Sequence, residues 1–180
     1  MPRFSEYVGE SLEELKKITR QKKEPITETI ISFSIGKVHL KRTFDYIKSW
    51  LVRYKIPYES VNPYLTLFKV IGVKDKYKLM NEIKDLKSYP YFEDGEVSVL
   101  RDGNRDYISV IFSPHDELMK PLREIFFNKS IGIMNESAYV KLISIEKDVF
   151  PENLWYEMLY SMPNIPNIKP GSVGLLSRRR

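Results

Sequence analysis

The sequence contains no cysteine and only two histidines among its 180 residues. Without cysteine there is no disulfide, no thiolate metal ligand and no thiol nucleophile. Histidine, with an ordinary pKa of about 6.5, is the side chain best suited to acid–base chemistry near neutral pH, so its scarcity leaves few candidates for such chemistry. His39 and His115 each lack a second ligand at helical spacing, and we expect no metal site and no cofactor.

Long hydrophobic runs are also missing. No stretch of about 18 apolar residues occurs, so we expect no membrane-spanning helix and no membrane partner. The first residues lack the apolar run of a secretory signal peptide, so we do not expect export. The absence of cysteine fits a reducing compartment. We therefore expect an intracellular location, in the cytoplasm or in a virus particle.

Acidic and basic residues are nearly balanced. Lys and Arg number 29 and Asp and Glu number 24, which gives a formal net charge of +5. We expect most of these charges on solvated faces. Basic residues gather at 16–23 and at 178–180, where they would suit a phosphate backbone or an acidic protein. Nucleic acid is therefore one candidate partner.

Hydrophobic periodicity predicts a single domain of alternating strands and helices. Alternation of apolar and polar residues predicts strands at 29–36, 63–71 and 138–146, and a hairpin at 96–112 that turns at Arg101–Asn104. Apolar stripes predict helices at 38–55, at 75–87 and from Ser113 onward, the last kinked or delayed by Pro121. This order favours an α+β fold, in which a mixed or antiparallel sheet carries helices on one side.

The two ends of the chain differ from this middle part. Residues 1–28 contain a capping box at Ser11 and a short helix poor in apolar residues. Residues 150–180 contain a short helical piece around 152–160, followed by three prolines that suggest an extended segment. We therefore expect a domain at 29–149 between two arms that contact protein partners. Long arms around a small domain are typical of subunits in large assemblies such as virus particles, an analogy of architecture.

Two of the predicted strands present similar short motifs, Tyr64-Leu65-Thr66-Leu67 and Tyr139-Val140-Lys141-Leu142. Strand alternation places the first and third residue of each motif on one face. On these motifs, and on the order of elements over about 29–146, the chain resembles the 2H phosphoesterase superfamily of LigT-like cyclic phosphodiesterases. The resemblance implies a two-lobed fold in which each lobe contributes a His-x-Thr or His-x-Ser motif to a site for a cyclic or related phosphate.

The chain departs from that family at most of the motif positions. Only Thr66 keeps a family residue, because tyrosine stands in both histidine places and Lys141 replaces the second hydroxyl residue. Tyrosine, with an ordinary pKa of about 10, is a poor base at neutral pH. We therefore expect no catalytic residue, and the resemblance implies a vestigial ligand-binding cleft of Tyr64, Thr66, Tyr139 and Lys141. The alternative is that the two tyrosines fill the former site as packed aromatic side chains.

Three functions remain open on the sequence. The first is a non-catalytic structural or binding protein, a pseudoenzyme whose arms contact neighbouring subunits of a larger assembly. The second is a phosphodiesterase that acts on RNA ends or cyclic nucleotides, with the tyrosines in altered roles. The third is an RNA-binding or phosphate-binding module without turnover. We favour the first on the sequence, because the two arms are the most distinctive feature outside the core.

Overall fold

The computed structural model describes residues 27–36, 38–85, 92–113, 116–130 and 132–179. Its strands are β1 (Thr27–Ser34), β2 (Tyr58–Ser60), β3 (Tyr64–Ile71), β4 (Glu93–Asp102), β5 (Arg105–Ser113), β6 (Gly132–Glu146) and β7 (Val173–Arg179). Its helices are α2 (Lys41–Arg53), α3 (Lys76–Asp85), α4 (Asp116–Lys129) and α5 (Glu152–Tyr160). The strands and helices predicted between residues 29 and 129 occur within a few residues of their expected bounds, and the strand predicted at 138–146 begins earlier, at Gly132. The helix predicted within residues 1–28 lies outside the described residues. The short strand β2 was not predicted, because three residues carry no readable period.

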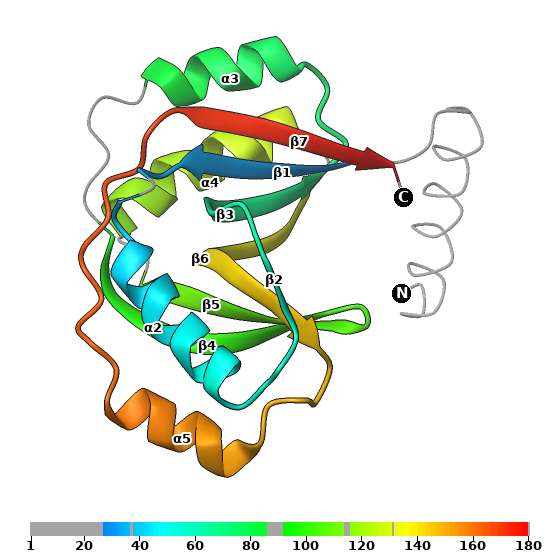
Figure 1. Cartoon of the computed structure of the whole chain (residues 1–180). Coiled ribbons are helices and arrows are strands. Elements are labelled where there is room, and N and C mark those ends of the chain that lie inside the picture. The colour runs from blue at the N-terminus through cyan, green and yellow to red at the C-terminus, as the bar shows by residue number, and fades with distance from the viewer. Residues whose placement is uncertain (1–26, 37, 86–91, 114–115, 131, 180) are drawn as a thin grey trace, which may run out of the picture.

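All strand pairs in the described part of the chain are antiparallel, in the order β4-β5-β6-β3-β1-β7, with β2 paired to β6 (Figure 1). The protein is therefore an α+β fold built on an open antiparallel sheet. The sequence suggests two lobes, whereas the seven strands form one continuous sheet. The reason is β6, which is 15 residues long and pairs with β3 along its first part and with β5 and β2 along its second.

The core lies between the sheet and the helices, which occupy the outer side of the curved sheet (Figure 1). Helix α2 buries Thr43, Ile47 and Leu51, which recur every four residues and so share one side of the helix. The Tyr46 hydroxyl donates a hydrogen bond of 2.8 Å to the Met158 carbonyl oxygen, which ties α2 to α5. None of the described helices combines the length and the apolar character that a bilayer crossing requires.

The structure defines the turn of the β4–β5 hairpin and the position of Pro121 in α4. The β4–β5 hairpin turns at Gly103 and Asn104, because Asp102 already pairs with Arg105. Gly103 has a φ of 63°, a conformation that costs glycine little. Helix α4 begins at Asp116 and continues through Pro121, so the proline does not delay its start. Proline has no N–H and its ring crowds the carbonyl four residues earlier, so α4 loses one hydrogen bond at Pro121 but continues to Lys129.

The C-terminal segment differs most from its prediction. The sequence suggests an extended arm over 150–180, but the structure folds this segment back and adds β7 to the sheet beside β1. The Gly171 N–H donates a hydrogen bond of 2.7 Å to the Ser34 carbonyl oxygen. A Cβ atom at Gly171 would lie 2.5 Å from the Ser34 hydroxyl oxygen, so only glycine fits this approach. The predicted N-terminal arm, residues 1–28, lies almost wholly outside the described residues.

Candidate functional site

The face of the sheet away from the helices carries the residues of the predicted cleft. Thr66 of β3 lies directly opposite Tyr139 of β6 in the strand register. Tyr64 and Lys141 lie one alternate position away on the same two strands and therefore face the same side. All four residues line one pocket of about 140 Å³. The structure thus brings the four predicted cleft residues together.

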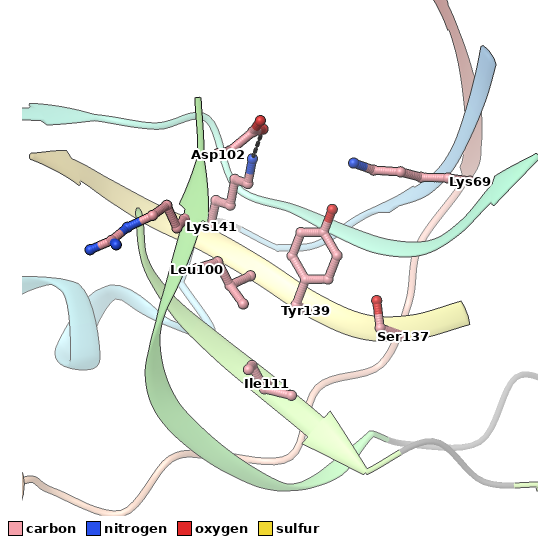
Figure 2. A pocket seen from close by; sticks show the side chains of 8 residues that line it. Lys69, Leu100, Asp102, Ile111, Ser137, Tyr139 and Lys141 are labelled. Carbon is pink, nitrogen blue, oxygen red and sulfur yellow. Dashed lines mark hydrogen bonds and ion pairs between the residues drawn. The ribbon is translucent and has the colours of Figure 1, made fainter. Parts of the chain in front are cut away.

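Figure 2 shows the lining of a second pocket, of about 320 Å³. This pocket shares Lys69, Asp102, Tyr139 and Lys141 with the first one. The larger pocket reaches Leu100 of β4, and the smaller pocket reaches Leu176 of β7. Because they share four lining residues, the two pockets form one depression across the open face, which we call the groove. The groove crosses the sheet from β4 to β7.

Lys69 enters the groove because β3 contains a bulge. Ser32 of β1 pairs with Thr66, and the preceding residue, Ile31, pairs with Phe68, so Leu67 is the extra residue in β3. Leu67 and Phe68 are both buried, and Lys69 becomes the next side chain on the open face. Strict alternation from Thr66 would instead place Lys69 on the buried face. Sequence reasoning missed Lys69 for this reason, and no sequence signal marks the bulge.

Lys141 is held by two groups of the β4–β5 hairpin. Its Nζ lies 3.0 Å from Asp102 Oδ2 and 4.0 Å from the centre of the Tyr107 ring. The Lys141 side chain is 24% exposed and the Asp102 side chain 52% exposed, so the ion pair lies at the edge of the groove and is open to solvent. Asp102 and Tyr107 were not predicted, because the hairpin is distant in sequence from both motifs.

Lys69, Tyr139 and Ser137 extend into the groove from the other side (Figure 2). The Lys69 ammonium has no ion pair with any side chain that the structure describes. Ser137 and Tyr139 lie on the same side of β6 and carry hydroxyl groups, which can donate hydrogen bonds to an anion. Together they provide a polar and positively charged floor.

The two tyrosines line the groove and do not fill it. Tyr64 is 50% exposed, and its hydroxyl oxygen accepts a hydrogen bond of 3.0 Å from the Asn62 side chain. Tyr139 is partly exposed and borders both pockets. Neither ring belongs to the buried core. A planar ligand therefore has access to both aromatic rings.

Among the described residues, no histidine and no group of metal-binding side chains lines the groove. His39 lies against Gly36, where a Cβ atom would be 3.2 Å from the imidazole ring, and it lines neither pocket. His115 lies outside the described residues. Within the described ranges, no three His, Cys, Asp or Glu side chains are close enough to hold a metal ion. The residues of the groove can bind and orient an anion, but they provide no imidazole for proton transfer.

A cluster of charged residues supports the turn end of the hairpin, close to Asp102. Asp106 is buried, and its carboxylate accepts hydrogen bonds from Arg101 Nε at 3.1 Å and from the Asp148 backbone N–H at 3.0 Å. Burial raises the pKa of Asp106, but these hydrogen bonds and the positive charges of Arg101 and Lys147 hold the pKa below its ordinary value of 3.8. Arg101 also binds Asp148. The cluster thus joins the hairpin to the turn after β6.

We expect Asp106→Asn to destabilise the protein by about 1–3 kcal/mol at neutral pH, because a buried acceptor of two hydrogen bonds is altered. Since the folded-state pKa lies below the unfolded value, ionised Asp106 stabilises the fold above pH of about 4, and this contribution is lost as pH falls through the folded-state pKa. Urea unfolding should therefore show a smaller difference between the two proteins at about pH 2.5 than at pH 7. Asp45→Asn, on the exposed side of α2, is the control. A constant difference at both pH values would contradict this prediction.

Comparison with known proteins adds no assignment. No model of a known protein family matches this chain, and a search of the curated proteins found no match.

Proposed function

We propose that this protein binds single-stranded RNA in the groove, through the phosphates and bases of the strand, and does not hydrolyse it. The observation that carries the proposal is the convergence of Lys69 and Lys141 with Tyr64 and Tyr139 on one open sheet face. Ammonium groups bind the phosphates of a strand, and exposed aromatic rings stack with its bases. An open sheet face that combines both is suited to unstacked RNA.

The resemblance to the 2H phosphoesterases supports a phosphate ligand. That family places one motif from each of two strands on a common site, and here Thr66 and Tyr139 are direct register partners. We propose a distant relationship, in which tyrosine and lysine replace the residues that move protons. Binding without turnover follows, because the groove as described contains hydrogen-bond donors and cations but no imidazole.

Assembly through two arms is the less favoured function once the C-terminal segment is considered. Residues 173–179 pair with β1 of the same chain and are therefore engaged within the sheet. The predicted contacts of residues 1–28 with neighbouring subunits, in a virus particle or another assembly, fall almost wholly outside the described residues. The groove consequently carries the functional proposal.

Lys69→Ala should weaken binding of a short fluorescent oligouridylate about 10-fold, because it removes one charge-assisted phosphate contact. The slope of log affinity against log salt concentration should become shallower by about 0.7, the contribution of one phosphate of a single strand. Fluorescence anisotropy over a range of salt concentrations measures both effects. Lys48→Ala is the matched control, since Lys48 is an exposed lysine on α2, on the other side of the sheet.

Equal losses in the Lys69 and Lys48 variants would show that binding is non-specific, and no binding by the unaltered protein would reject the proposal. A parallel assay with 2′,3′-cyclic nucleotides tests the competing enzyme. We expect no hydrolysis. Turnover that disappears in Tyr64→Phe and Tyr139→Phe would replace the binding proposal with a phosphodiesterase.

A further inference from the structure

We infer that Asp102 is a resident counter-ion that competes with the ligand's phosphate for Lys141, and that it therefore sets the affinity of the groove. This inference rests on the proposed function and concerns how the same groove admits its ligand. It assigns to Asp102 a role that opposes binding. Lys69 then makes the first contact, and Lys141 becomes available only when its carboxylate partner is displaced.

The distribution of charge along the groove supports this order. Among the residues that the structure describes, three cationic side chains line the groove, those of Lys69, Arg101 and Lys141. Arg101 binds Asp106 and Asp148, and Lys141 binds Asp102 at 3.0 Å. Lys69 alone among these three has no acidic partner within the described side chains. An incoming anion therefore meets one uncompensated ammonium group.

The position of Asp102 makes its displacement feasible. Asp102 is the last residue of β4, beside the two-residue turn, and its side chain is about half exposed. An ion pair so open to solvent contributes about 0–1 kcal/mol, so a phosphate can compete with it. The Tyr107 ring lies 4.0 Å from Lys141 Nζ and can keep the ammonium in place after the carboxylate leaves. Lys141 is thus held in position to bind a phosphate as soon as the Asp102 carboxylate is displaced.

The test is Asp102→Asn, measured by fluorescence anisotropy with the same fluorescent oligouridylate. Asparagine keeps the shape of the side chain and removes its charge, so we expect binding about 3- to 10-fold tighter. The gain should vanish when Lys141→Ala is combined with Asp102→Asn, because the released cation is then absent. Urea unfolding of each variant checks that the hairpin remains folded.

Glu96→Gln is the matched control. Glu96 lies on β4, pairs with Ile111 and so belongs to the same sheet face, but it lines neither pocket. The Glu96→Gln substitution removes one negative charge, as Asp102→Asn does, but does not release Lys141. We therefore expect the affinity for the oligouridylate to change less than 2-fold. An equal gain from Glu96→Gln, or unchanged or weaker binding by Asp102→Asn when the unaltered protein binds, would overturn the inference and leave the proposed function standing. No binding by any of these proteins would reject the proposed function itself.

Discussion

Phe68→Ala should lower the free energy of unfolding by about 3–5 kcal/mol, the range typical of removing a buried phenylalanine ring. Phe68 is 1% exposed, and its ring meets Phe126 edge-on with the ring centres 4.6 Å apart. The substitution would leave a cavity between β3 and α4 that the surrounding sheet and helix cannot easily fill. Urea denaturation at neutral pH measures the effect.

Phe127→Ala is the control for this prediction, because Phe127 is the next residue after Phe126 on α4 but is 78% exposed. We expect it to change stability by no more than about 0.5 kcal/mol. The comparison also tests the bulge at Leu67. If β3 alternated without interruption, Phe68 would face the groove and Lys69 the core, and Phe68→Ala would then cost little. A loss below about 1 kcal/mol would therefore contradict both the packing and the placement of Lys69.

Removal of β7 by ending the chain after Pro170 should destabilise the protein by about 4 kcal/mol or more, since each backbone hydrogen bond contributes about 0.5–1.5 kcal/mol net. Seven residues of β7 pair with β1, from Val173 opposite Phe33 to Arg179 opposite Thr27. Val173 and Leu175 also pack against the core and would be lost. Urea unfolding should show a lower midpoint or no cooperative transition.

Leu176→Ser serves as the control for the truncation, because Leu176 belongs to the same strand but is about half exposed on the groove face. It should leave the midpoint nearly unchanged while β7 remains paired. An unaltered midpoint in the truncated chain would instead favour the extended C-terminal arm that the sequence suggests. The assembly function would then regain its main support.

Phe68 and β7, the subjects of these two predictions, both support residues that line the groove. Phe68 anchors the bulge that turns Lys69 into the groove, and β7 extends the open face to Leu176. The hairpin, braced by Asp106 and Arg101, brings Asp102 to Lys141 from another part of the sheet. Loss of any of these supports should therefore alter binding as well as stability. Binding measured under conditions where each variant is folded would separate the two effects.

Much of the fold was readable from local patterns. The apolar stripe of α2, the alternation in β1 and β3 and the Asp-Gly turn each reflect short-range geometry, with repeats of 3.6 or 2 residues or a preference for positive φ. The cleft residues Tyr64, Thr66, Tyr139 and Lys141 were also predicted, because alternation within each strand selects the residues that share a face. That the two motifs would share one cleft was implied only by the family resemblance, and the direct pairing of β3 with β6 came from the structure.

The sequence by itself determined the composition of this protein's chemistry: no thiol, little histidine, and tyrosine and lysine at the motif positions. Only the tertiary structure decided which cations would meet in the groove and which would be neutralised. Bulges reverse the facing of every later residue in a strand, and ion pairs such as Lys141 with Asp102 join residues far apart in sequence. The same holds for β7, whose residues Val-Gly-Leu-Leu-Ser-Arg-Arg do not alternate and do not indicate that they join the sheet beside β1.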